Sequence, residues 1–198
     1  MPTTTASQGL NGAVIIPGGT AARIDKPVAP GADGDTRTSR EFSLRVAASQ
    51  GYSVDMAELL RTAWSMIHPD SLRYGDELRI AIHEAFSNAL LHGCLEVDGF
   101  EVRSVENLRW QEELVQHRLV EPCYADRTIA IRLTDNGPAT TVAVEHDGPG
   151  FTPPEDWVAF IEARPGRGLH IIHTLADSIS VEQDGRRIVF EIAGRSRE

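Results

Sequence analysis

The sequence predicts an α+β fold: a two-layer α/β sandwich with a mostly antiparallel sheet covered on one face by helices. The order of the predicted elements favours this fold, because one strand and three helices precede a hairpin, and further helical sequence separates it from a second hairpin. Strands joined as hairpins run antiparallel. The chain also lacks the regular strand–helix alternation that a doubly wound parallel sheet requires.

The first half of the folded part is predicted to be a strand followed by two helices. Three alternating apolar residues indicate the strand: Phe42, Leu44 and Val46. A helix is predicted over residues 53–67, with Ser53 as its N-terminal cap and Pro69 just beyond its end. A second helix is predicted over residues 76–92, and Gly93 is expected to end it.

Residues 94–126 are predicted to be a helical insertion. Residues 102–119 have helical spacing and mixed charge, and Pro122 is expected to close the segment. Two strands follow, and the Asn136-Gly137 pair between them is typical of a tight hairpin turn.

The last part of the chain is predicted to hold two helices and a second hairpin. A short helix is expected over residues 155–163, and another begins at Gly166 and runs to about residue 176. Strands over residues 178–183 and 186–192 then form the closing hairpin, which turns at Asp184-Gly185.

The first 38 residues are rich in glycine, proline, threonine and alanine. Their only apolar run is Val14-Ile15-Ile16, which is too short to offset the entropy lost on ordering such a segment. We therefore expect residues 1–38 to be a disordered or loosely packed tail, and residues 39–194 to be one domain.

The composition excludes several classes of function. The chain has 29 acidic and 19 basic residues and a formal charge of −10, so it should repel nucleic acid where no basic patch intervenes. No stretch approaches the roughly 20 apolar residues that cross a bilayer, and the N-terminus lacks a secretory signal. We expect a cytoplasmic protein without a nucleic-acid or membrane partner.

The two cysteines, Cys94 and Cys123, do not form a CxxC pair. A zinc site would need help from His92 or His117, and metal sites usually have tighter ligand spacing. Two free thiols in a reducing compartment are the simpler interpretation.

Three segments carry the chemistry, and the first lies in the second predicted helix. Glu84, Asn88 and His92 are spaced four residues apart and therefore line one side of that helix. A carboxylate and an amide oxygen one turn apart suit a general base and a Mg²⁺ ligand. A solvated helix face would show the same spacing.

The second segment, at the end of a strand, contains Asp147, Gly148 and Gly150. A carboxylate there can accept a hydrogen bond from the exocyclic amine of adenine, whereas the guanine carbonyl would be repelled. The glycines would let the backbone approach a flat ring. A plain Asp-Gly turn is the alternative interpretation.

The third segment contains Gly166, Arg167, Gly168 and Leu169. Glycines just before a helix leave its first N–H groups open for phosphate. Arg164 or Arg167 can add charge-assisted contacts. A flexible helix start would have the same composition.

Taken in order, the three segments resemble the GHKL ATPases, which include gyrase, heat-shock chaperones, histidine kinases and mismatch-repair proteins. The Glu-Ala-xx-Asn-Ala-xx-His-Gly run of residues 84–93 is similar to the anti-sigma-factor serine kinases. The stretch from Leu175 to Arg186 also looks like that group. The resemblance covers about residues 40–193 and implies a histidine kinase-like ATPase fold.

The resemblance implies a role for each matching residue. Glu84 would be the general base, Asn88 would ligate Mg²⁺ and Asp147 would bind the adenine of ATP. Gly148 and Gly150 would shape the adenine pocket.

The third segment would bind the phosphates. Gly166 and Gly168 would meet them within a short lid over about residues 151–167, and Arg167 and Leu169 would complete that part of the nucleotide site.

The chain departs from the family in two ways. The 94–126 segment is longer than in a minimal anti-sigma kinase and resembles variants that accompany bacterial serine phosphatases. No segment looks like the phospho-accepting helix pair of a sensor kinase, so His83 and His92 are expected to pack or hydrogen-bond rather than carry phosphate.

Three functions follow from these observations. The first is a serine/threonine protein kinase of the anti-sigma type that phosphorylates a small antagonist protein. The second is a module that captures a sigma factor or another regulator when ATP is bound, with little turnover. The third, a structural protein without nucleotide, is disfavoured because three segments in order are hard to obtain by chance. A homodimer is a family-level expectation only.

Overall fold

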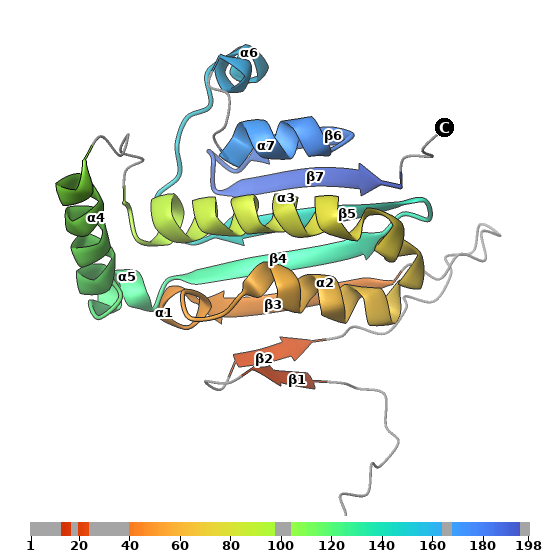
Figure 1. Ribbon diagram of the computed structural model, residues 1–198, viewed down its shortest axis with the longest axis horizontal. Coiled ribbons are helices and arrows are strands. Elements are labelled where there is room, and N and C mark those ends of the chain that lie inside the picture. Colours follow the sequence, from red (N-terminus) through yellow and green to blue (C-terminus); the bar gives the residue numbers. More distant parts are fainter. Residues whose placement is uncertain (1–12, 17–19, 24–39, 98–103, 164–167, 195–198) are drawn as a thin grey trace, which may run out of the picture.

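The computed structural model describes residues 13–16, 20–23, 40–97, 104–163 and 168–194. Within these residues the chain forms one antiparallel sheet with helices packed against it (Figure 1). This arrangement is the α+β sandwich that the order of elements predicts.

The sheet has seven strands in the order β1-β2-β3-β4-β5-β7-β6, and each neighbouring pair is antiparallel. The strands are β1 (Ala13–Ile16), β2 (Thr20–Arg23), β3 (Glu41–Ala47), β4 (Thr128–Asp135), β5 (Ala139–His146), β6 (Ser178–Glu182) and β7 (Arg187–Ala193).

The α-helices are α1 (Ala48–Gly51), α2 (Met56–Ile67), α3 (Gly75–Ser87), α4 (Val105–Arg118), α5 (Pro122–Ala125), α6 (Trp157–Glu162) and α7 (Gly168–Leu175). Two other helical segments flank α3: the 3₁₀-helix η1 (Pro69–Tyr74) and the π-helix η2 (Asn88–Cys94).

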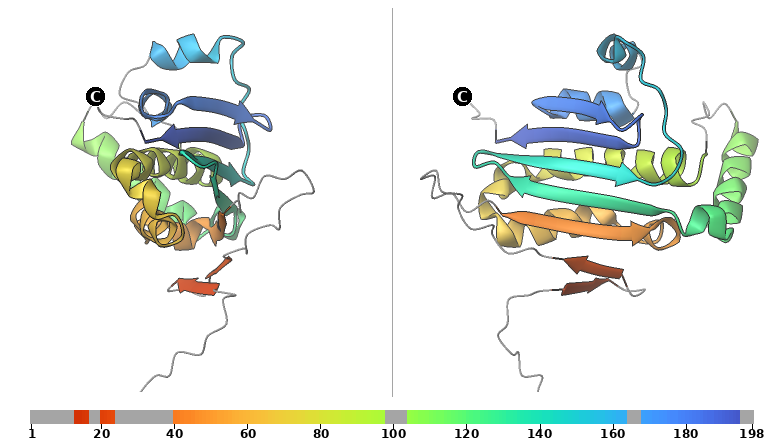
Figure 2. Two further views of the ribbon diagram at one scale, coloured as in Figure 1. Left: turned by 90° about the vertical axis from the view of Figure 1, so that its right-hand side faces the viewer. Right: turned by 180° about the vertical axis from the view of Figure 1, so that it is seen from behind.

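The layers are plain when the molecule is turned (Figure 2). Helices α2 and α3 cover one face of the central strands, and the view from behind shows the other face of those strands without a helix over it. The core lies between α2, α3 and the inward residues of the sheet, and its largest fully buried side chains include Trp64, Phe42, Phe190, Leu60, Ile82 and Ile131.

Both predicted hairpins are present. In the first, Gly137 adopts a φ of 85° in the turn between β4 and β5. In the second, Gln183, Asp184 and Gly185 all have positive φ values between β6 and β7. The turn residues therefore take the left-handed conformations that such short connections require.

Two helix boundaries differ from the predicted ones. Helix α2 is capped by Asp55, whose carboxylate accepts a hydrogen bond from the Glu58 backbone N–H at 3.1 Å, and not by Ser53. Pro122 begins the short helix α5 instead of closing the insertion. Both changes follow known preferences, since aspartate is a strong N-cap and proline is tolerated at the first helical position.

The predicted helix over residues 76–92 is divided. Regular α-helical bonding ends at Ser87, and η2 continues with wider turns, so that the Leu95 N–H donates to the Leu90 carbonyl five residues earlier. Gly93 lies inside η2 and does not end the helix. A π-helical turn within a helix often marks a functional site.

Two short segments of the expected tail form strands. β1 and β2 make a hairpin that pairs with β3 through Ala22 and Leu44 and through Arg23 and Ser43. This pairing places the hairpin on the edge of the sheet, beyond β3 (Figure 1). The remaining residues of the tail lie outside the described part of the chain.

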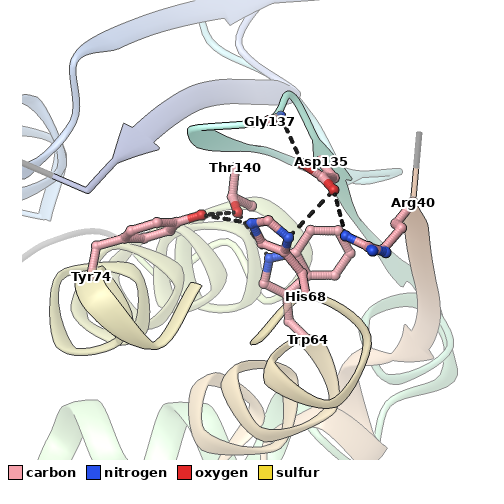
Figure 3. Close-up of polar contacts among 7 residues, drawn as sticks. All are labelled: Arg40, Trp64, His68, Tyr74, Asp135, Gly137 and Thr140. Carbon is pink, nitrogen blue, oxygen red and sulfur yellow. Dashed lines mark hydrogen bonds and ion pairs between the residues drawn. The ribbon is translucent and has the colours of Figure 1, made fainter. Parts of the chain in front are cut away.

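A buried polar cluster joins α2, η1 and the β4–β5 hairpin (Figure 3). The Thr140 hydroxyl accepts a hydrogen bond from the Trp64 indole N–H at 2.9 Å and lies 2.8 Å from the Tyr74 hydroxyl. Tyr74 also lies 3.3 Å from Nε2 of His68. These contacts supply partners for polar groups in a region that is closed to water.

The outer end of the same cluster is ionic. Asp135 accepts a hydrogen bond from Arg40 at 3.1 Å and another from the Gly137 backbone N–H at 2.7 Å. Nδ1 of His68 lies 3.3 Å from the Asp135 carboxylate, which is close enough for an ion-pair contact but not aligned as a hydrogen bond. The cluster fixes α2 and η1 to the sheet.

Candidate functional site

A cavity of about 650 Å³ lies between the helical layer and the end of β5. This volume is in the range of small-molecule and cofactor sites. The helical wall consists of Ala85, Asn88, Ala89, His92 and Gly93. The opposite wall comes from β5 and the loop after it, and consists of Val144, His146, Pro149, Gly150 and Phe151.

The N-terminus of α7 lies directly against Glu84 and Asn88. A Cβ added at Gly168 would lie 2.9 Å from the Glu84 carboxylate and 2.9 Å from the Asn88 amide nitrogen. Any larger residue at this position would have to displace the ends of these two side chains. The structure thus brings together two of the predicted segments, which are 80 residues apart in the chain.

Asn88 has an unsatisfied amide. Its Nδ2 atom is buried and has no hydrogen-bond partner among the described residues. A buried amide without a partner is costly and indicates a missing ligand or water. The first N–H groups of α7 are also open at this point, as at any helix N-terminus. This end of the cavity therefore suits phosphate together with a hard cation.

Of the other residues in the third segment, Leu169 lines the cavity. Gly166 and Arg167 fall outside the described residues. The short predicted helix before them is α6, which stands away from the sheet (Figures 1 and 2).

The glycines of the second segment allow close backbone packing. A Cβ added at Gly148 would lie 2.1 Å from the Gly93 carbonyl oxygen, and one added at Gly150 would lie 1.9 Å from the Asp184 carbonyl oxygen. Gly150 lines the cavity, whereas Gly148 is buried behind it. Both glycines hold the loop after β5 against its neighbours and so shape the wall of the cavity.

Asp147 is not among the residues that line the cavity, and its role in binding the base stays a prediction. Its carboxylate accepts hydrogen bonds from the Thr128 backbone N–H at 2.7 Å and from the Thr128 hydroxyl at 3.1 Å. Asp147 follows Glu145 in the alternation of β5 and lines a small recess on the open side of the sheet. Its carboxylate therefore pins the ends of β4 and β5 together.

His146, the residue before Asp147, lines the cavity. It follows Val142 and Val144 on the inward side of β5, and the same period of two that predicted the strand places it there. Sequence reasoning did not name His146 as a cavity residue, although the alternation of β5 indicates its side of the strand.

The environment of His146 disfavours its charged form. Burial lowers the pKa of His146 below its ordinary value, and the nearby guanidinium groups of Arg186 and Arg127 add to this effect. A hydrogen bond with the Gly185 backbone and the charge of Asp147 act in the opposite direction. The imidazole is thus held neutral over a wider pH range than a free histidine.

The insertion contributes two charged residues to the cavity, Glu96 and Arg118. Arg118 lies 4.9 Å from the ring centre of Tyr124, and Arg127 lies 5.0 Å from that centre. Arg127 also donates to the Cys94 carbonyl at 2.7 Å and pairs with Glu96 at 2.7 Å. These contacts fasten α4 and α5 to the rim of the site.

The cysteine residues do not form a metal site in the described structure. Cys94 is buried, and Cys123 is exposed. No group of three or more His, Cys, Asp or Glu side chains within the described ranges is arranged to hold a metal ion. Mg²⁺ does not need such a group, because it usually binds through one or two protein oxygens together with phosphates and water.

Among the described helices, none has the length and apolar character needed to cross a membrane. No curated protein matches the chain. A family model does match it: residues 36–192 fit the histidine kinase-like ATPase domain. The matched range contains every element that builds the cavity, from the end of α3 to β7.

Proposed function

The chain belongs to the histidine kinase-like ATPase domain family, and from this premise we propose that it is a serine/threonine protein kinase of the anti-sigma-factor type. ATP is the ligand that family membership supports. The proposed substrate is a serine or threonine hydroxyl on a small antagonist protein. A sigma factor or a serine phosphatase is a further candidate partner.

The contact of Glu84 and Asn88 with Gly168 is the observation that carries this proposal. It puts a carboxylate and an unsatisfied amide beside the open N-terminus of an eight-residue helix. Phosphate at that N-terminus would have both side chains next to it. Glu84 is half-buried and lies one helical turn before Asn88, which lines the cavity.

In the proposed reaction, Glu84 takes the proton of the acceptor hydroxyl. The hydroxyl oxygen forms a bond to the γ-phosphorus of ATP, and the bond from that phosphorus to the oxygen bridging to the β-phosphate breaks. The products are a phosphorylated side chain and ADP, and the proton remains on Glu84 until it is lost to solvent. Positioning and charge neutralisation would supply most of the rate enhancement.

Magnesium would be held through Asn88 and the phosphates, and would neutralise charge on the phosphates. The donor set fits a hard cation, since an amide oxygen is a normal magnesium ligand. The buried Nδ2 of Asn88 is a donor that the described residues leave without an acceptor, and it would be available to donate to a phosphate oxygen.

A phosphoryl-transfer assay with radiolabelled ATP tests the proposal. Candidate antagonist proteins encoded beside this chain would be incubated with the purified full-length protein. Replacing Glu84 by Gln should reduce transfer by about 10²- to 10⁴-fold, the usual contribution of a general base, while ATP binding is retained. The matched control is Glu77→Gln in the first turn of the same helix. Equal rates for Glu84→Gln and wild type would eliminate the proposed base.

A second candidate function is a nucleotide-dependent partner-binding module with little turnover. The observation in its favour is that α4 carries both a cavity residue, Arg118, and exposed apolar side chains near its other end. Val105, Leu108 and Trp110 are each more than half exposed. Exposed apolar groups on a protruding helix are typical of an interaction surface.

The two functions are separated by nucleotide-dependent capture of a sigma factor or antagonist protein. A binding module would retain its partner in the presence of ATP when Glu84 is replaced by Gln, and would lose it in Leu108→Glu. A kinase without such a surface would lose phosphoryl transfer when Glu84 is replaced by Gln, and would keep it in Leu108→Glu.

A further inference from the structure

We propose that a second cavity, on the opposite side of α3 and η2 from the nucleotide cavity, binds a small amphiphilic anion, namely an apolar chain that carries one carboxylate. The second cavity measures about 490 Å³ and lies between residues 51–57 and residues 79–91. This volume is in the range of small-molecule sites. The inference goes beyond the proposed function and does not depend on the kinase reaction.

The two cavities are separate. They share no lining residue. Ala85, Asn88 and Ala89 line the nucleotide cavity, whereas Phe86 and Leu90 line the second one. A helix has about 3.6 residues per turn, so these two sets lie on opposite sides of the same segment. A ligand can therefore occupy the second cavity while a nucleotide occupies the first.

Apolar side chains form much of the wall of the second cavity. They are Val54, Met56, Phe86, Leu90 and Leu91. Val54 and Leu91 are half-buried, so part of their apolar surface is open to a ligand, and the other three are buried behind them. Each methylene group that a ligand buries against such a wall should raise its affinity by about fourfold.

Polar side chains line the same cavity along α3. Arg79, His83 and Ser87 are spaced four residues apart, so they form a row on one side of the helix. Ser53 adds a hydroxyl from the connection between α1 and α2. The second cavity thus combines an apolar wall with one guanidinium and further hydrogen-bond donors.

The charge of Arg79 is not paired. This half-buried side chain makes no hydrogen bond or ion pair with any other residue that the structure describes. Glu58 is close enough to sense it, but the pKa of Glu58 is lowered mainly by its hydrogen bond with Arg61, and Arg79 only adds to that effect. The Arg61 Nε–H donates to Glu58 at 2.9 Å.

The one carboxylate among the lining residues is Asp55. It caps α2 by accepting a hydrogen bond from the Glu58 backbone N–H at 3.1 Å, so the N-terminus of that helix compensates its charge. Arg79 has no such compensation. A single unpaired guanidinium matches one planar carboxylate, which it can bind through two parallel hydrogen bonds.

The experiment uses octanoate as the probe and octan-1-ol as its neutral analogue. Amide chemical shifts of the ¹⁵N-labelled full-length protein, recorded without nucleotide, locate the site and give the dissociation constants. We expect octanoate to bind at about millimolar concentration or below and to shift amides within residues 51–57 and 79–91. Octan-1-ol should bind about tenfold more weakly, since it lacks the charge. Hexanoate, which is two methylene groups shorter, should also bind about tenfold more weakly.

Three variants test the role of Arg79. Arg79→Gln should weaken octanoate binding by about tenfold and leave octan-1-ol binding unchanged, whereas Arg79→Lys should keep the preference for octanoate. Arg73→Gln is the matched control, because it removes the same charge from a side chain that is 79% exposed and outside the cavity. It should bind octanoate like wild type. The amide spectrum of each variant verifies that the fold is retained.

Several results would overturn the proposal. One is the absence of any saturable shift at millimolar octanoate, and another is equal affinity for octanoate and octan-1-ol. A third is unchanged octanoate binding in Arg79→Gln. Shifts that fall only around the nucleotide cavity and vanish when magnesium–ATP is added would place the probe in the wrong cavity. Failure of ATP itself to bind would count against the proposed function alone, because octanoate is titrated without nucleotide.

Discussion

Gly168 lies against Asn88 so closely that an added Cβ would sit 2.9 Å from the amide nitrogen and 3.1 Å from the amide oxygen. The absence of a side chain at the first residue of α7 thus sets the distance between that helix and the Glu84–Asn88 pair. The same position opens the backbone N–H groups that would receive phosphate. This contact gives the first of four predictions.

Gly168→Ala should weaken ATP binding by at least about tenfold and shift the melting temperature by less than about 2 °C. The atoms that the new methyl would meet are the ends of two side chains, which can move aside without disturbing the fold. Displacement of the Glu84 and Asn88 side chains would weaken their proposed contacts with the nucleotide. Calorimetry and thermal unfolding measure the two effects.

Gly75→Ala is the control for this substitution. A Cβ at Gly75 would meet only the Arg61 Cδ atom, at 3.9 Å, which is ordinary van der Waals contact. It should therefore bind ATP like wild type. If Gly168→Ala binds ATP as tightly as Gly75→Ala, the close contact of Gly168 with Glu84 and Asn88 does not contribute to ATP binding.

Thr140→Val should destabilise the protein by about 2–3 kcal/mol without changing its affinity for ATP. Valine has a similar shape but leaves the Trp64 indole N–H without its acceptor and removes the 2.8 Å partner of the Tyr74 hydroxyl. Thr140 is fully buried, so water cannot replace the lost hydroxyl. Urea denaturation measures the free energy of unfolding.

The control for the buried cluster is Thr140→Ser, which keeps the hydroxyl and loses one methyl group. It should be more stable than Thr140→Val. If the two variants unfold at the same urea concentration, the hydrogen bonds of Thr140 contribute little and packing alone fixes α2 to the sheet.

The two cysteines should differ sharply in reactivity. Burial raises the pKa of the Cys94 thiol to about 12, with the charge of Asp147 adding to the rise and Arg127 opposing it. Since the thiolate is the reactive form, Cys94 should be inert to Ellman's reagent at pH 8 in the folded protein. Cys123 is exposed and should react.

The folded Cys123→Ser variant should therefore barely react with Ellman's reagent until urea unfolds it. The Cys94→Ala variant should react with the reagent at the wild-type rate. Two equally fast thiols in the native protein would contradict the buried position of Cys94.

Acid should destabilise the protein partly through His146. Its ordinary pKa of 6.5 is lowered in the folded state, chiefly by burial. The unfolded chain therefore binds more protons below pH 6.5, and its share of the population rises as the solution is acidified. The contribution of His146 to stability is full above pH 6.5 and is lost as the pH falls through the folded-state pKa.

His146→Leu should accordingly lose less stability than wild type between about pH 7.5 and about pH 5. Urea denaturation across that range gives the slope of the free energy of unfolding against pH for each protein. Because each protein is compared with itself at high pH, the effect of the substitution on packing cancels. Parallel curves would show that His146 titrates alike in both states.

The elements that follow from local chemistry were predictable from the sequence. Strand β3 shows a period of two in its apolar residues, and the Asn136-Gly137 and Asp184-Gly185 pairs mark hairpin turns that the structure contains. The Glu84 and Asn88 positions follow from helical spacing alone. Local spacing suffices wherever each residue's neighbours in sequence determine its conformation.

Other features depend on contacts between distant segments, which a local pattern does not contain. The π-helix η2 departs from the predicted regular helix, and its Gly93 carbonyl meets Gly148, 55 residues later in the chain. Pairing of β2 with β3 likewise depends on a free sheet edge. The side of β5 on which His146 lies was available from the alternation of that strand, but its place in the cavity wall depends on the helix opposite.

Helix α4 is held near its C-terminal end, where Val115 is buried and Arg118 reaches the cavity, while Val105 at the other end is 68% exposed. About 20 Å of helix separates Val105 from Arg118 at 1.5 Å per residue. The helix is therefore anchored at its cavity end. A rotation of about 5° at Arg118 would carry Val105 through about 2 Å, because a rigid helix of that length magnifies angle into displacement.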